Sequence, residues 1–147
     1  MAEIEGLMGR ILGLDYGTRR IGVALSDLLG MTAQPFVVHT RKSLKDDMLQ
    51  LGVIVKEQQV TKIVVGYPIN MDGSEGPLAR EAKTFAEHIG KELNVPVELY
   101  DERLTTMQSE RILVEEADMS REKRKLVRDK VAASILLQAY LDQHRLY

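Results

Sequence analysis

The sequence contains no cysteine and no tryptophan, and only 5% of its 147 residues are aromatic. Without cysteine the chain cannot form a disulfide scaffold, an iron–sulfur cluster or a thiolate zinc site. The scarcity of rings argues against a protein that binds single strands by stacking bases on its side chains. No stretch approaches the ~20 consecutive apolar residues of a membrane span, so we expect no membrane segment.

The charge balance also excludes a class of protein. Lys and Arg number 20 and Asp and Glu 22, giving a net charge of −2. This is not the globally basic balance of a protein that holds nucleic acid by charge alone, although a local basic patch remains compatible with it. The first ten residues carry two glutamates and no apolar core, so we expect no export signal and a cytoplasmic location.

The length predicts a single domain over residues 1–147, with residues 1–9 as a poorly ordered N-terminal extension. Apolar runs predict strands and a 3.6-residue periodicity predicts helices. Ser43 is expected to cap the first helix, Pro77 to begin the second, and Pro35 to place the third strand near a sheet edge. The expected strands cover 10–16, 20–26, 33–39, 62–66 and 97–100, and the expected helices cover 43–56, 77–93, 105–116 and 126–143.

This order of elements predicts an α/β fold. The first two strands are joined by the short turn 17–19 and should form an antiparallel hairpin, with the third strand beside them. The alternating helices and strands that follow should add parallel strands through right-handed crossovers. The result is a five-stranded mixed sheet with helices on both faces, and a common solution with this order is the ribonuclease H-like fold.

Three carboxylates on separate elements are candidates for a functional site. Asp15 ends an otherwise apolar strand, where an unpaired charge is costly to bury. Alternatively, it only hydrogen-bonds the turn that follows. Glu102 lies just past the carboxyl end of the last strand, where open α/β sheets bind ligands. Alternatively, it only places a negative charge at the start of the next helix.

Asp129 is the third candidate. Helical spacing places it with small and apolar residues on the face of the last helix that should pack against the sheet. The alternatives are a solvated position in the first helical turn, or a salt bridge to Lys125 or Lys130. Together the three acids suggest an oxygen-only site for a hard cation, Mg²⁺ or Mn²⁺. One or two such ions would activate a water against a phosphodiester.

Three blocks of the sequence resemble the YqgF/RuvX family, whose members are named as Holliday junction resolvases or as pre-16S rRNA nucleases. The blocks are ILGLDYGTRRIGVALSD at 11–27, IVVGYPINMDGSEGPLAREAKTFAEHI at 63–89, and VELYDERLTTMQSERIL at 97–113 leading into VRDKVAASILLQAYLD at 127–142. The resemblance implies a ribonuclease H-like fold and a metal-dependent nuclease, a hydrolase of phosphodiester bonds. The family's acidic site carries over onto Asp15, Glu102 and Asp129, and all three positions hold the expected acid.

The resemblance further implies a role in maturing the 5′ end of 16S rRNA during ribosome biogenesis. The partners would then be structured RNA and a pre-ribosomal particle. One alternative is a resolvase of branched DNA, whose two symmetric cuts would require a homodimer rather than a monomer. Another is a non-catalytic RNA-binding factor in ribosome assembly. An ATPase of the actin and sugar-kinase type also begins with an Asp-x-Gly-Thr hairpin, but it needs two domains and a far longer chain.

Several polar residues are candidates for substrate binding. Gly17 and Thr18 could approach a phosphate or only form the turn, and Arg20 could contact a phosphate or form a structural ion pair. A basic run leads to Asp129 and could steer a polyanion or only be a solvated face. The block 70–76 is characteristic of the family, which favours substrate binding over a flexible connection. The predicted binding residues are Gly17, Thr18, Arg20, Asn70, Gly73, Ser74, Lys125 and Arg128.

Overall fold

The computed structural model describes residues 9–105 and 120–144. The predicted helix over 105–116 lies almost wholly outside the described residues, as do the first eight residues of the expected N-terminal extension. Among the described residues, no helix has the length and apolar character needed to cross a membrane.

The described chain forms one five-stranded mixed sheet in the order β3-β2-β1-β4-β5. β2 pairs with β1 and β3 in antiparallel fashion, whereas β4 pairs with β1 and β5 in parallel. This is the predicted architecture, and Pro35 lies in an edge strand as expected. The strands are β1 (Arg10–Asp15), β2 (Arg20–Ser26), β3 (Ala33–Thr40), β4 (Val60–Tyr67) and β5 (Val97–Asp101).

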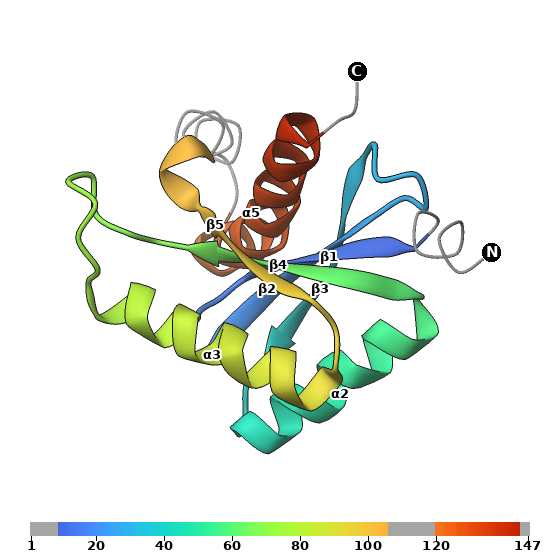
Figure 1. Ribbon diagram of the computed structural model, residues 1–147. Coiled ribbons are helices and arrows are strands. Elements are labelled where there is room, and N and C mark those ends of the chain that lie inside the picture. The colour runs from blue at the N-terminus through green and yellow to red at the C-terminus, as the bar shows by residue number, and fades with distance from the viewer. Residues whose placement is uncertain (1–8, 106–119, 145–147) are drawn as a thin grey trace.

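Helices cover both faces of the sheet (Figure 1). On one face, α2 (Leu44–Glu57) and α3 (Pro77–Leu93) bury apolar side chains against every second residue of the central strands. On the other face, α5 (Arg121–Gln143) packs on the alternate residues, and it is the only α-helix there among the described residues. The strand alternation that places successive side chains on opposite faces therefore produces two separate apolar cores.

The helix starts follow local capping. The Oγ of Ser43 accepts a hydrogen bond from the Asp46 amide at 3.0 Å, as predicted, and Pro77 begins α3. The last helix begins at Arg121, five residues before the predicted start at 126. Ser120 caps it, and the basic residues that follow have no apolar periodicity from which the earlier start could be predicted.

α5 lies very close to the sheet because glycines occupy the strand positions beneath it. A methyl group at Gly22 would overlap the backbone carbonyl oxygen of Asp129. A methyl group at Gly13 would lie 2.8 Å from Cβ of Leu137. This close approach brings Asp129 down toward the carboxyl end of β1, where Asp15 lies.

We expect Gly22→Ala to destabilise the protein by about 1–3 kcal/mol, because the added methyl group forces α5 away from the sheet. Gly90→Ala in α3 is the matched control, since its methyl group would meet only Val97 at an ordinary 3.7 Å. There the gain in helix propensity should stabilise by up to about 1 kcal/mol. Chemical denaturation of the two variants measures both changes. Equal stability of Gly22→Ala and the wild type would show that α5 does not depend on this close approach.

Candidate active site

The candidate site lies at the edge of the sheet where the parallel strands β1, β4 and β5 end. Asp15 is the last residue of β1, and Glu102 follows β5 directly as the first residue of a short 3₁₀ helix, η1 (Glu102–Thr105). β4 lies between these two strands. A methyl group at Gly66 of β4 would overlap Oε1 of Glu102. The Glu102 side chain therefore lies over β4, and it forms a hydrogen bond with the side chain of Asp15.

The two carboxyl groups strongly affect each other's protonation. Burial raises the pKa of Glu102 from 4.5 to about 8, and the neighbouring charge of Asp15 contributes in the same direction. Burial also raises the pKa of Asp15, from 3.8 to about 6, although the hydrogen bond from Glu102 favours its charged form. Protonated Glu102 thus donates to the Asp15 carboxylate. Near neutral pH this proton compensates for the proximity of two acids that would otherwise repel each other.

Asp129 is the third acid of the site, and its charge raises the pKa of Asp15 further. It is the ninth residue of α5, so the alternative of a solvated acid in the first helical turn is wrong. The salt bridge expected as an alternative does exist, but with a different residue. Oδ2 of Asp129 lies 2.9 Å from Nε of Arg20, at the start of β2. Of the two roles expected for Arg20, the structure contains the structural ion pair.

The chemistry of the three acids fits a hard divalent cation. All donors are carboxylate oxygens, and the close contact of Asp15 with Glu102 is unfavourable once both are ionised, which a cation would relieve. The closest contact of Asp129 with Arg20 is made by Oδ2. The three acids do not, however, bring one oxygen each within 4.8 Å of one another. A cation would therefore have to draw them closer together.

Among the described residues, a different group does bring one possible ligand atom each within 4.8 Å of one another. It consists of His39, Asp46 and Asp47. Asp47 is fully buried, and its two oxygens are already bonded to Nε2 of His39 at 2.8 Å and to Nε of Arg41 at 2.9 Å. These partners satisfy the buried carboxylate without a metal.

The predicted binding loop forms a compact turn beside the site. The Asn70 amide donates to the Ser74 carbonyl oxygen at 2.9 Å, and the Gly73 amide donates to the Asn70 carbonyl oxygen at 2.8 Å. Gly73 has a φ of +89°, which other residues rarely adopt. Nδ2 of Asn70 also donates to Oγ of Ser74. The segment is thus internally hydrogen-bonded rather than an open connection.

Sequence reasoning missed Arg103, the residue that joins this loop to the site. Its guanidinium donates to both oxygens of Asp101, and Nη1 donates to the Met71 carbonyl oxygen at 3.2 Å. Gly66 was missed as well. A glycine in an apolar strand signals a close approach, but the sequence does not show which residue approaches.

The remaining predicted residues lie in less enclosed places. Gly17 lies in the hairpin turn, where a methyl group would overlap the Arg20 carbonyl oxygen, and the Thr18 side chain is exposed. Arg128 is exposed on α5 beside Asp129. The side chain of Lys125 lies outside the described part of the structure.

The sequence model of the RuvX family, described as Holliday junction resolvase, matches residues 9–143. This chain belongs to the RuvX family. A relative from Halothermothrix orenii, named "Putative pre-16S rRNA nuclease", is 52% identical over 139 residues, which cover 94% of this chain and 99% of the relative. One from Myxococcus xanthus with the same name is 51% identical over 136 residues, covering 92% of this chain and 89% of the relative.

Two solved structures share the fold of this RuvX-family chain. Thermus thermophilus RuvC in complex with a Holliday junction substrate matches with a TM-score of 0.55 and 14% identity, covering 92% of this chain and 94% of RuvC. The fowlpox virus Holliday junction resolvase matches with a TM-score of 0.51 and 13% identity, covering 91% of this chain and 99% of the resolvase chain. At such low identity the likeness is one of fold, and it confirms the predicted ribonuclease H-like architecture.

We expect Asp15→Asn to make the fold more stable at pH 8 when no divalent cation is present. In the wild type the folded state retains protons up to about pH 6 on Asp15 and about pH 8 on Glu102, whereas their ordinary pKa values are 3.8 and 4.5. The unfolded state binds fewer protons across this window, so stability is lost as the pH rises through it. Asp15→Asn removes one of the two charges and should flatten that decline.

Thermal unfolding of both proteins in EDTA, between pH 4 and pH 8, measures the difference. Each kcal/mol gained corresponds to roughly 2–4 °C in melting temperature. Parallel curves for the two proteins would contradict the placement of two mutually repelling carboxyl groups.

Proposed function

We propose that this protein is a metal-dependent nuclease that hydrolyses phosphodiester bonds in precursor 16S rRNA. The observation that carries the proposal is the hydrogen-bonded pair Asp15 and Glu102, with Asp129 beside it, at the carboxyl edge of a ribonuclease H-like sheet. Ligands of open α/β sheets bind at this edge. The names of the relatives from Halothermothrix orenii and Myxococcus xanthus support the choice of RNA as substrate.

Asp15, Glu102 and Asp129 would hold Mg²⁺ or Mn²⁺. The bound cation would polarise the scissile phosphate and lower the pKa of an attacking water. To bind it, Glu102 must lose the proton that it donates to Asp15. Arg20 orients Asp129 toward the sheet through their ion pair, and Gly66 leaves room for the Glu102 side chain over β4.

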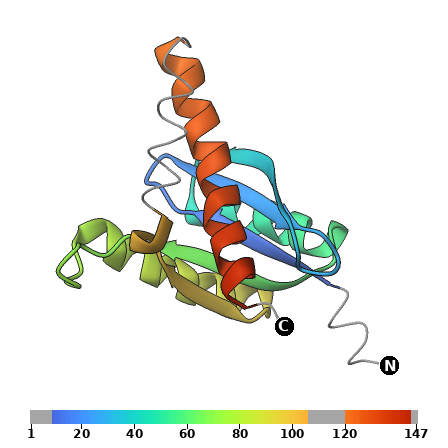
Figure 2. The same cartoon turned by 90° about the horizontal axis from the view of Figure 1, so that it is seen from above.

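Substrate contacts are proposed on both sides of the acids. On one side lies the loop that contains Asn70, Gly73 and Ser74, which Arg103 attaches beside Glu102. On the other side lies the first half of α5, which extends beyond the sheet in Figure 2 and carries Arg128. Basic side chains on this half would contact phosphates and set the register of the strand. We assign the same role to Lys125, and to Gly17, Thr18 and Arg20 at the hairpin turn.

Asp15→Asn tests the proposed activity, because it keeps the size of the side chain and removes its charge. We expect cleavage of labelled 16S precursor RNA in Mn²⁺ or Mg²⁺ to fall by about two orders of magnitude or more, as for the loss of one electrostatic catalytic group. EDTA should abolish cleavage by the wild type. Glu57→Gln is the control, since it removes one exposed acid at the far end of α2. Cleavage by Asp15→Asn at the wild-type rate would refute the site.

A four-way DNA junction in the same assay tests the alternative that the family description raises, a junction resolvase. Paired, symmetric cuts in the junction, with intact RNA, would replace the rRNA role with that of a resolvase. Cleavage of neither substrate, with RNA binding unaffected by Asp15→Asn, would point to a non-catalytic RNA-binding factor.

Cation binding can be measured without cleavage. At a Mn²⁺ concentration 100 times the dissociation constant, the wild type should gain about 2.7 kcal/mol of stability, because only the folded state presents the three acids together. Asp15→Asn should gain much less. Melting temperatures with and without Mn²⁺ measure this gain, and an equal gain in both proteins would mean that the ion binds elsewhere.

A further inference from the structure

A buried ion pair lies on the opposite side of the sheet from α5, close to the hairpin turn. Asp47, in the first turn of α2, has no exposed surface. Its Oδ2 accepts a hydrogen bond from Nε of Arg41 at 2.9 Å, and its Oδ1 lies 2.8 Å from Nε2 of His39. A fully buried carboxylate with these partners fixes the position of the Arg41 guanidinium, since moving away would leave the charge uncompensated.

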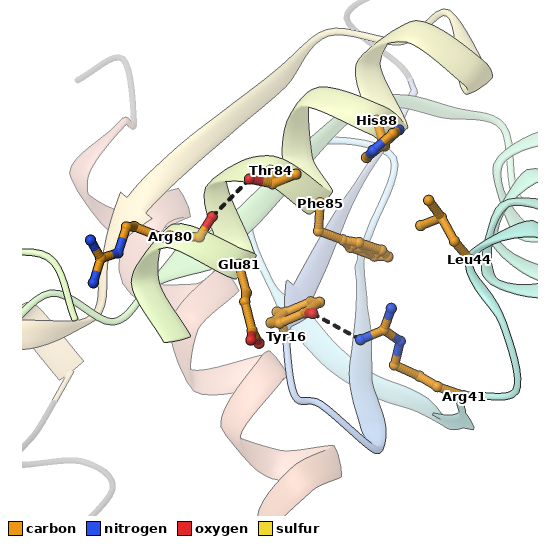
Figure 3. Close-up of a pocket in the computed structure, with 8 residues that line it drawn as sticks. All are labelled: Tyr16, Arg41, Leu44, Arg80, Glu81, Thr84, Phe85 and His88. Atoms are coloured by element: carbon orange, nitrogen blue, oxygen red, sulfur yellow. Dashed lines mark hydrogen bonds between the residues drawn. The ribbon is translucent and has the colours of Figure 1, made fainter. Parts of the chain in front are cut away.

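The rest of the Arg41 guanidinium holds the turn that follows Asp15. Nη1 donates to Oη of Tyr16 at 2.9 Å and to the Gly17 carbonyl oxygen at 3.2 Å. The backbone amide of Arg41 donates to the Arg19 carbonyl oxygen at 2.9 Å. Arg41 thus contacts three of the four residues between β1 and β2. Figure 3 shows its guanidinium reaching Tyr16 across the pocket.

Aromatic rings also pack against the Arg41 guanidinium and help to fix its position. The Arg41 guanidinium lies 4.9 Å from the centre of the Tyr16 ring and 5.3 Å from that of Phe85 in α3. The two rings are 5.0 Å apart. These three side chains line a pocket of about 350 Å³ between α3 and the start of α2 (Figure 3). The turn is therefore fixed from the side of the sheet that carries no candidate catalytic residue.

Strand alternation connects the two sides. Tyr16 joins the core beneath α2 and α3, whereas the preceding Asp15 side chain reaches Glu102 on the α5 side. Arg20, which orients Asp129, ends the same turn. A shift of the turn would therefore move Asp15 and Arg20 together. Small displacements of groups that bind a metal are costly for both affinity and rate.

We propose that Arg41 is a positioning residue: held by buried Asp47, it fixes the turn that carries Asp15 and Arg20 into the candidate active site. The effect on catalysis rests on the proposed nuclease function, whereas the effect on the turn does not. An arginine suits this position because its planar fork bonds the carboxylate through Nε and the turn through Nη1 at the same time. A lysine ammonium could compensate for Asp47 but could not span both groups.

Arg41→Lys is the variant that tests the proposal, because it keeps a positive charge beside the buried Asp47 and allows folding. Tyr16→Phe is a milder second variant that removes only the hydroxyl acceptor. Tyr100→Phe is the matched control, since the Tyr100 hydroxyl is buried without a hydrogen-bond partner among the described residues. Three quantities are measured on the full chain: amide hydrogen exchange over residues 15–22, Mn²⁺ affinity, and the separate kcat and KM for RNA cleavage.

For Arg41→Lys we expect exchange over residues 15–22 to accelerate about tenfold, and the Mn²⁺ dissociation constant to rise by about tenfold or more, as when outer-shell partners of a metal site are lost. The kcat should fall and KM for RNA should rise, because the turn that Arg41 holds carries both Asp15 and the proposed phosphate contacts Gly17, Thr18 and Arg20. Tyr16→Phe should show the same changes at smaller size, and Tyr100→Phe none.

Two results would overturn the proposal. One is unchanged exchange over residues 15–22 in Arg41→Lys. The other is faster exchange with wild-type Mn²⁺ affinity and kcat, which would make Arg41 a stability residue only. A wild type that neither binds Mn²⁺ nor cleaves RNA would refute the nuclease function instead, and faster exchange in Arg41→Lys would then still support its hold on the turn.

Discussion

The constraint on which this molecule depends is the placement of two acids, Asp15 and Glu102, in contact with each other at a partly buried edge of the sheet. Ionised carboxylates repel at this distance, and burial removes the water that would screen them. The pair is therefore stable when it shares a proton or binds a cation. It is unfavourable when both acids are ionised and no cation is bound. A site that is unfavourable when both acids are ionised and free of ligand is typical of groups arranged for chemistry rather than for stability.

The scaffold enforces this placement from both faces of the sheet. On the α5 side, Gly66 leaves room for the Glu102 side chain, and Gly22 lets α5 bring Asp129 close to the sheet. On the other side, Arg41 and buried Asp47 hold the turn after Asp15. The contacts on the two faces of the sheet thus hold the backbone segments that carry the acids in place. The energy that offsets their repulsion comes from the two apolar cores, each lying on one face of the sheet.

The architecture was predictable because its signals are local. Apolar runs marked the five strands, Ser43 and Pro77 marked two helix starts, and chain order gave the mixed sheet. The contacts that shape the site are non-local. Nothing in the sequence near Arg103 indicates its bond to Met71, and nothing near Arg41 indicates its partner Asp47 or the turn that it holds. Pairings of this kind depend on strand register and helix position, which a pattern of residue types does not determine.

The net charge of −2 raises the question of where the proposed nuclease would attract a polyanion. Three arginines near the site have acidic partners: Arg20 with Asp129, Arg41 with Asp47 and Arg103 with Asp101. Their charge is largely compensated by these partners, so they add little long-range attraction for a polyanion. In the proposed nuclease, long-range attraction would therefore come from a cation held by the acids and from the basic first half of α5. Recognition and chemistry then depend on the same helix, because α5 carries Asp129 as well as the basic residues that precede it.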